Sequence, residues 1–202
     1  MGSYRADNQA NHSWRSVMFA TDCSHPTDTR QRKGTPEQLR YAITPCPLGL
    51  LLMAASDRGL CALLFADDEQ ALIDELQARF PAGELQCDQA GLQEWLDAVL
   101  TQLQDPSRRA DLPLDLRGSA FQQRVWQTLQ TIEPGKTMRY GELAATLGSH
   151  ARAVARACAS NPIGLLVPCH RVVGADQAVT GYRWGVARKS ALLAAERKSA
   201  GA

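Results

Sequence analysis

The spacing of apolar residues changes along this 202-residue chain, and that change limits the folds it can adopt. Between residues 40 and 65 the apolar residues form three short runs, which are typical of β-strands. From Gly118 onward they recur mainly at helical spacing. A strand-rich segment followed by a helical one favours an α+β fold in two parts.

The first part is expected to be a small antiparallel sheet with helices, forming a domain at about 38–112. Asp57-Arg58-Gly59 is a good hairpin turn, and we expect Asp67 to cap a helix that ends before Pro81. Residues 105–116 have the composition of a linker. The expected strands are 40–44, 48–56 and 60–65, and a second amphipathic helix is expected over 91–104.

The second part, at 113–202, is expected to be helical. Ser119 can cap a helix that Pro134-Gly135 ends. Two short helices follow, at 140–148 and 151–160, in the arrangement of a helix-turn-helix. A basic amphipathic helix over 186–198 closes the chain. The first of these helices carries on one face Phe121, Val125, Trp126 and Leu129.

Residues 1–37 are polar and aperiodic, so we expect them to be disordered. Cys23 and His25 lie close together, but two ligands do not make a zinc site, and we expect no metal. The N-terminus has no apolar segment of the secretory kind. The longest apolar stretch, 48–55, is far shorter than the roughly 20 residues of a membrane span. These features predict a cytoplasmic protein with no membrane association.

The net charge of +1 conceals a strong polarity along the chain. Residues 40–112 carry five basic and twelve acidic side chains, whereas residues 113–202 carry twelve basic and five acidic. One interpretation is that the C-terminal part binds a polyanion. The alternative is that the two parts attract each other, and charge alone does not decide between them.

Among six cysteines without a CxxC pair, Cys169 stands out because His170 follows it. A thiol with the usual pKa of about 8.5 is mostly protonated at neutral pH and is a poor nucleophile. A neighbouring imidazole can take its proton, directly or through a water. A carboxylate such as Glu196 could hold the imidazole in the required tautomer. A buried free cysteine with only a packing role is the alternative.

Two segments decide between these readings: SNPIGLLVPCHRVV at 160–173 and GYRWGVARKSALL at 181–193. Together they closely resemble the active-site region of the O6-alkylguanine-DNA alkyltransferases. The second segment is most similar to the C-terminal half of the bacterial adaptive-response proteins. The likeness continues upstream through DLRGSAFQQRVWQTLQTIEPGKT and, more weakly, to YAITPCPLGLLLMAASDRGLCALLF, so that it covers about 37–198.

The resemblance implies a role for each matching residue. Cys169 would accept the alkyl group, His170 would act as base through a water, and Glu196 would orient His170. Asn161 would hydrogen-bond near the thiolate and link the recognition helix to the site. The remaining roles concern DNA, with contacts from Tyr140, Arg152 and Arg171 and a base pocket lined by Tyr182, Val172 and Lys189.

DNA recognition in this family places the recognition helix in the minor groove and requires the damaged base to leave the stack. Arg152 would fill the space that the base leaves, and the small side chains of ARAVARACAS would let the helix approach closely. Phosphate contacts, which would account for the basic C-terminal part, are expected from Arg152, Arg156, Arg171, Arg183, Arg188 and Lys189.

The sequence departs from the family in two places. The zinc-holding cysteines and activator module of the fused adaptive-response protein are missing, although KGTPEQLR resembles a remnant of the activator. The turn between Gly148 and Arg152 is about two residues short and lacks the usual proline. The orientation that Arg152 has in the family therefore cannot be assumed for this chain.

The expected function is therefore direct, stoichiometric and irreversible transfer of an alkyl group from O6 of guanine, and less readily from O4 of thymine, to Cys169. The expected partner is double-stranded DNA, without a cofactor, and the expected state is a monomer. There are two alternatives from other functional classes. One is a binder of alkylated DNA that transfers nothing, but such relatives lack the cysteine. The other is a Cys-His hydrolase, which would turn over.

Overall fold

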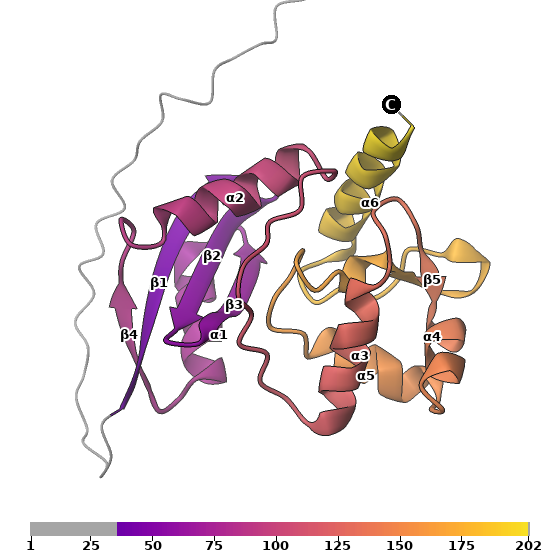
Figure 1. Cartoon of the computed structure of the whole chain (residues 1–202), viewed down its shortest axis with the longest axis horizontal. Coiled ribbons are helices and arrows are strands. Elements are labelled where there is room, and N and C mark those ends of the chain that lie inside the picture. Colours follow the sequence, from indigo (N-terminus) through magenta and orange to yellow (C-terminus); the bar gives the residue numbers. More distant parts are fainter. Residues whose placement is uncertain (1–35, 202) are drawn as a thin grey trace, which may run out of the picture. The chain divides into compact units, whose positions relative to one another are not determined.

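The computed structural model describes residues 36–201, and these form the expected α+β fold. Figure 1 shows the sheet with α1 and α2 in one half and the remaining helices in the other. The predictions for residues 1–35, including Cys23 and His25, lie outside the described residues. The elements are β1 (Glu37–Cys46), β2 (Gly49–Ser56), β3 (Gly59–Ala66), α1 (Glu69–Arg79), β4 (Gly83–Cys87), α2 (Gln93–Gln104), α3 (Ala120–Gln130), β5 (Met138–Arg139), α4 (Tyr140–Thr146), α5 (Ala151–Ala159), β6 (Val172–Val173) and α6 (Val186–Ala200).

The four-stranded sheet has the order β3-β2-β1-β4. The three predicted strands pair in antiparallel fashion, with the turn at Asp57 and Arg58. The antiparallel sheet is extended by a fourth strand that was not predicted, β4, which pairs in parallel with β1. The sequence of β4, GELQC, gives little sign of a strand, since its side chains alternate between half-buried and exposed. The first strand begins at Glu37, before the expected start of the domain.

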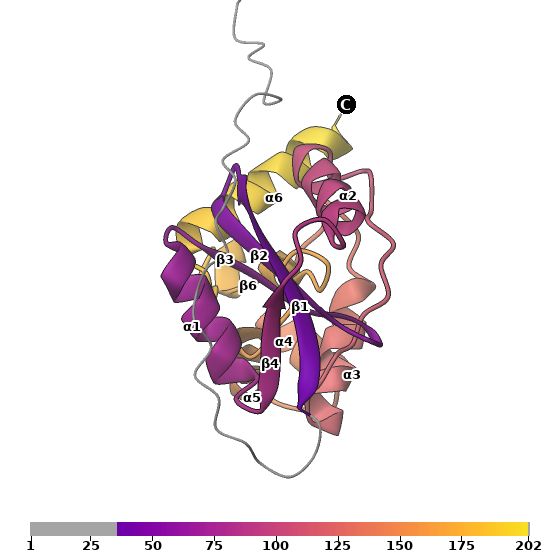
Figure 2. The same cartoon turned by 90° about the vertical axis from the view of Figure 1, so that its left-hand side faces the viewer.

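Helix α1 begins one residue later than predicted. Its N-cap is Asp68, whose Oδ1 accepts a hydrogen bond from the amide of Ala71 at 2.9 Å. Asp67, the predicted cap, instead binds Arg188 at 2.5 Å. In Figure 2 α1 lies to one side of the strands and α2 to the other. Helix α1 ends at Arg79, before Pro81, as expected.

Strand β3 is the edge of the sheet that meets the helical half. Leu60 exchanges two backbone hydrogen bonds of 2.8 Å with the segment Pro113–Asp115. Further along, the amide of Leu63 donates to Pro162 O and its carbonyl accepts from Gly164 N, both at 2.9 Å. An edge strand has free backbone groups that need partners. The segment that leads to Cys169 satisfies these groups, so the sheet directly fixes its position.

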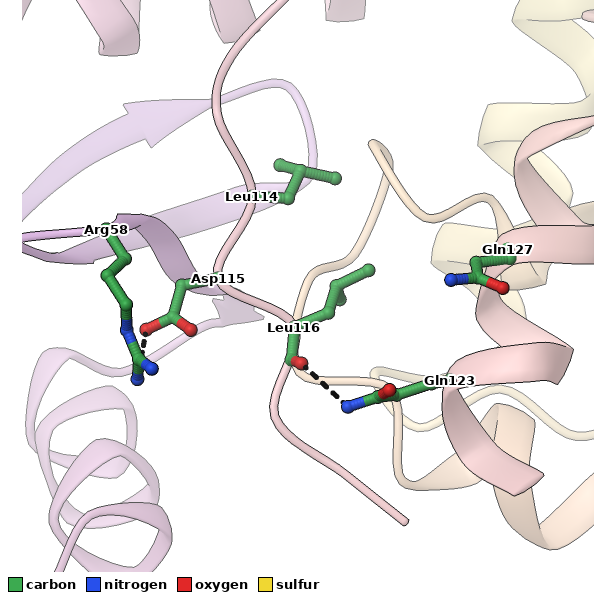
Figure 3. A pocket seen from close by; sticks show the side chains of 6 residues that line it. All are labelled: Arg58, Leu114, Asp115, Leu116, Gln123 and Gln127. Carbon is green, nitrogen blue, oxygen red and sulfur yellow. Dashed lines mark hydrogen bonds and ion pairs between the residues drawn. The ribbon is translucent and has the colours of Figure 1, made fainter. Parts of the chain in front are cut away.

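The linker at 105–116 is anchored by the buried carboxylate of Asp115. That carboxylate accepts hydrogen bonds from Ser56, Arg58 and Arg117. Asp115 and Arg58, drawn in Figure 3, line a hollow whose volume is about 350 Å³. Its lining residues include no cysteine and are Arg58, Leu114, Asp115, Leu116, Gln123 and Gln127.

The helical half follows the predicted pattern. Ser119 and Gln122 form a capping box at the start of α3, and the helix buries Val125, Trp126 and Leu129. Phe121, expected on the same face, is half-buried. Helices α4 and α5 pack against each other as a helix-turn-helix, and α5 also packs on α3. No helix in the described part of the chain is both long and apolar enough to cross a membrane.

Candidate active site

Cys169 lies at the start of a 3₁₀ turn, Cys169–Arg171, between α5 and β6. The residue is only 3% exposed. Pro168 precedes it, and the turn leads into β6, which pairs in parallel with β5. The turn also contacts α3 and α6. The sulfur is therefore held from both directions along the chain.

Asn161 links the end of α5 to the cysteine. Its Nδ2 donates to Val167 O at 2.8 Å and to the Sγ of Cys169 at 3.2 Å. Its Oδ1 accepts from the amide of Ile163 at 3.0 Å. Leu165, inside this loop, has a φ of +64°. That left-handed conformation is costly for a non-glycine residue, and the contacts of Asn161 help to hold the loop in it.

The Cys169 thiol is protonated at neutral pH. Burial raises its pKa to about 11, although the hydrogen bond from Asn161 and the charge of Lys189 oppose that rise. Desolvation disfavours a thiolate in this way whenever the group is far from water. A base is therefore needed to remove the proton.

His170 and Glu196 supply that base. The two side chains are joined by a 2.8 Å hydrogen bond between Nε2 and Oε1. Burial alone would raise the pKa of Glu196, but hydrogen bonds from His170 and Arg171 outweigh it and hold the value at about 2. Because an ionised carboxylate can only accept, Nε2 carries the proton. Nδ1 then carries a lone pair and no proton, and it is buried without a partner among residues 36–201.

Arg171 braces Glu196 and does not face solvent. Its guanidinium is 2% exposed and donates to both carboxylate oxygens of Glu196, at 2.8 to 3.1 Å. A third nitrogen donates to Ile132 O. The prediction that Arg171 contacts DNA is wrong, because a buried charge must keep its partner. A cation within the apolar run VPCHRVV was the signal for such a partner.

Lys189 is also buried, beside the predicted base pocket. Its Nζ donates to Val172 O at 2.5 Å, Thr180 O at 2.7 Å and Gly181 O at 3.2 Å. It also lies 5.7 Å from the centre of the Tyr140 ring. These carbonyls occupy all three of its protons, so the prediction of a phosphate contact is wrong for Lys189.

Two tyrosines lie near Cys169. The hydroxyl of Tyr182 is buried without a partner in the described part of the chain. Burial raises the pKa of Tyr182 well above its usual value, and a thiolate at Cys169 would raise it further. Tyr140 donates to Gly181 O at 3.4 Å, and burial raises its pKa to about 12. Both hydroxyls therefore stay protonated and can donate hydrogen bonds to a substrate.

Helix α5 presents the remaining predicted DNA contacts. Arg152 is the second residue of this helix, and both Arg152 and Arg156 are exposed. They share a hollow of about 360 Å³ with the start of α3. Arg183 and Arg188 instead bind Glu75 and Asp67 at 2.8 and 2.5 Å.

Within residues 36–201 no three His, Cys, Asp or Glu side chains converge where a metal ion could bind. Four thiols in this part are free, those of Cys46, Cys61, Cys158 and Cys169. Burial raises the pKa of Cys158 to about 12, and only Cys169 has the hydrogen bond from Asn161.

Two family models match the chain. The 6-O-methylguanine DNA methyltransferase ribonuclease-like domain matches residues 39–116, and the DNA binding domain of the same name matches residues 120–198. The Escherichia coli bifunctional transcriptional activator/DNA repair enzyme Ada is 46% identical over 163 residues. This match covers 80% of the chain but only 46% of that protein, so the chain spans about half of the Ada relative.

Other relatives match along nearly their whole length. A methylated-DNA–protein-cysteine methyltransferase from Mycolicibacterium paratuberculosis is 41% identical over 162 residues, which are 79% of this chain and 93% of that one. The crystal structure of Mycobacterium tuberculosis OGT in complex with DNA is 35% identical, with a TM-score of 0.64. The likeness covers 80% of this chain and 94% of that chain.

Proposed function

The chain belongs to the 6-O-methylguanine DNA methyltransferase family, and we propose that it repairs alkylated DNA by accepting the alkyl group on Cys169. The substrate is O6-alkylguanine in double-stranded DNA, and O4-alkylthymine is a poorer one. The transfer is irreversible, so each chain acts once.

One observation carries the proposal: Nδ1 of His170, the residue that follows Cys169, has no hydrogen-bond partner among residues 36–201. The Glu196 carboxylate fixes the proton on Nε2, which leaves Nδ1 as the acceptor. Nδ1 takes the thiol proton, directly or through one water. The proton has to move because the buried thiol has a pKa of about 11.

The transfer is a displacement at carbon. The Sγ of Cys169 forms a bond to the alkyl carbon as the bond between that carbon and O6 breaks. The guanine leaves with the electron pair, and the Tyr182 hydroxyl can donate to it as that charge develops. The proton that the thiol gave to His170 balances the one that the guanine gains. No cofactor is required.

The reaction needs the target base outside the stack, and this costs a few kcal/mol. Arg152, exposed on α5, is proposed to fill the vacated space, and Tyr140 to press on the adjacent phosphate. Arg156, one helical turn further along, is the proposed phosphate contact. The small residues of α5 permit close approach to the minor groove.

We further propose that the chain acts as a cytoplasmic monomer. Its proposed domains are a scaffold at about 38–112 and a DNA-binding and acceptor part at 113–202. The residues that precede Glu37, the first residue of β1, are proposed to be dispensable. The proposed base pocket includes Val172 and Lys189 beside Tyr182, and Lys189 shapes it by holding three carbonyls.

Mass spectrometry after incubation with O6-methylguanine duplex tests the function. We expect one adduct of about 14 Da per chain, on the peptide that contains Cys169, because the nucleophile keeps the group. Cys169→Ser should form none, whereas the matched control Cys158→Ser should react normally. Multiple turnovers, as in a hydrolase, or an adduct on Cys158 would contradict the proposal. A protein that binds the lesion without any adduct would be a damage sensor.

A further inference from the structure

The carboxyl end of α5 is held by two arginines from other parts of the fold. Arg183 Nη1 donates to Ala159 O at 3.3 Å, and Arg79 Nη1 donates to Ser160 O at 3.4 Å. Cations are favoured at this end of a helix, where carbonyls lack intrahelical partners. Arg79 comes from α1 in the sheet half, and Arg183 comes from the loop that precedes α6.

Glu75 binds both arginines through a single oxygen. Its Oε1 lies 2.8 Å from Arg183 Nε and 3.4 Å from Arg79 Nη2. All three side chains are partly buried, with 18% to 35% of their surfaces exposed. Two guanidinium groups this close repel each other, and the carboxylate between them offsets that repulsion.

Both arginines adjoin residues of the candidate active site. Ser160, which accepts from Arg79, directly precedes Asn161, the donor to the Sγ of Cys169. Arg183 directly follows Tyr182, whose buried hydroxyl has no partner in the described part of the chain. A shift of the cluster would therefore move both the Asn161 amide and the Tyr182 ring.

We propose that Glu75, a residue of the sheet half, is a positioning residue for alkyl transfer. By holding Arg79 and Arg183 on the end of α5, it fixes Asn161 against the thiol and Tyr182 in the base pocket. This inference rests on the proposed function and gives the sheet half a part in the chemistry. Glu75 itself touches neither Cys169 nor the substrate.

The test compares Glu75→Gln with Asp74→Asn, the neighbouring change on the same helix. Asp74 is exposed and accepts a hydrogen bond from Gln70, outside the cluster. We expect Glu75→Gln to slow transfer at saturating duplex by on the order of tenfold, since small misplacements of reacting groups are costly. The DNA concentration at half-maximal rate should stay within about twofold of wild type, because the exposed DNA contacts are unchanged. Asp74→Asn should match the wild type in both quantities.

A double-mutant cycle separates positioning from simple loss of stability. If Glu75 acts through Arg183, then Arg183→Gln should be as slow as Glu75→Gln, and the double variant should be little slower than either. Additive losses would overturn the proposal. So would a Glu75→Gln protein that melts at a lower temperature yet transfers at the wild-type rate.

A second measurement needs no DNA and holds even if the wild type transfers no alkyl group. The rate at which iodoacetamide modifies Cys169, followed on its peptide against pH, gives the apparent pKa of the thiol. Losing the Asn161 hydrogen bond should raise this pKa in Glu75→Gln, whereas general loosening would expose the thiol and lower it. An unchanged or lower pKa would contradict the proposal without touching the proposed function.

Discussion

At the scale of residues, burial shifts the pKa values of the neighbouring Cys169 and His170 in opposite directions. Burial raises the pKa of the Cys169 thiol to about 11, so that the sulfur stays protonated until a base acts. Burial also lowers the pKa of His170, although Glu196 opposes this. The imidazole is therefore neutral at physiological pH and ready to accept a proton. Arg171 keeps Glu196 ionised and so preserves the tautomer.

The pH profile of transfer follows from these shifts. In the wild type the rate should be nearly constant from about pH 7 to 9, and should fall only below about 6.5, as His170 becomes protonated. In His170→Gln we expect a loss of about 10²–10⁴-fold at neutral pH, with the rate then rising steadily toward the thiol pKa. Stopped-flow transfer assays at constant ionic strength provide the measurement. A wild-type rate that climbs with pH between 7 and 9 would show that His170 is not the base.

At the scale of elements, the turn between α4 and α5 is short but regularly capped. Gly148 adopts a φ of +60°, the left-handed conformation common after a helix, and Ser149 N donates to Ala144 O at 2.9 Å. His150 is the N-cap of α5, and its Nδ1 accepts from the amide of Ala153 at 3.2 Å. The recognition helix therefore begins at Ala151 and exposes Arg152 in its first turn.

We expect Arg152→Ala to slow repair of duplex DNA by on the order of tenfold or more. Flipping the base costs a few kcal/mol, and losing only about 1.4 kcal/mol of the compensation that Arg152 provides would slow the reaction tenfold. Reaction with free O6-methylguanine should barely change, because the free base needs no flipping. Arg156→Ala is the matched control: it should weaken duplex binding and reduce its salt dependence without slowing transfer at saturation. Equal losses for Arg152→Ala on duplex and free base would refute the stack-filling role.

At the scale of the molecule, the sequence predicted those features of the fold and the site that depend on residues close together in the chain. The strands of the hairpin, the capped helix after Ser119 and the short helices were visible as runs and caps. The pairing of Cys169 with His170 could be predicted because the two residues are adjacent in the sequence. Strand β4 was missed, because five polar-rich residues depend on β1 for their hydrogen bonds. The burial of Arg171 was also missed, since its partner Glu196 lies 25 residues away.

The charge polarity along the chain has a partly internal explanation. Arg183 and Arg188, which were expected to contact phosphate, pair with Glu75 and Asp67 across the two halves. The alternative that the halves attract each other is therefore supported for these two cations. Arg152 and Arg156 stay exposed and available to DNA.

Acid should destabilise the whole fold in two stages, and the first belongs to His170. Its pKa is lowered in the folded state, so the unfolded chain binds the proton more readily, and stability falls as pH drops below about 6.5. The slope for one such group approaches about 1.4 kcal/mol per pH unit. Glu196, with a folded pKa of about 2 against an ordinary 4.5, adds stability that is lost only between those two values.

Urea denaturation at pH 7.5, 6.5, 5.5 and 5.0 measures the first stage. His170→Gln should flatten the dependence between pH 6.5 and 5.0, whatever its effect on stability at pH 7.5. A wild-type free energy of unfolding that stays constant from pH 6.5 to 5.0 would mean that His170 accepts a proton inside the fold without penalty.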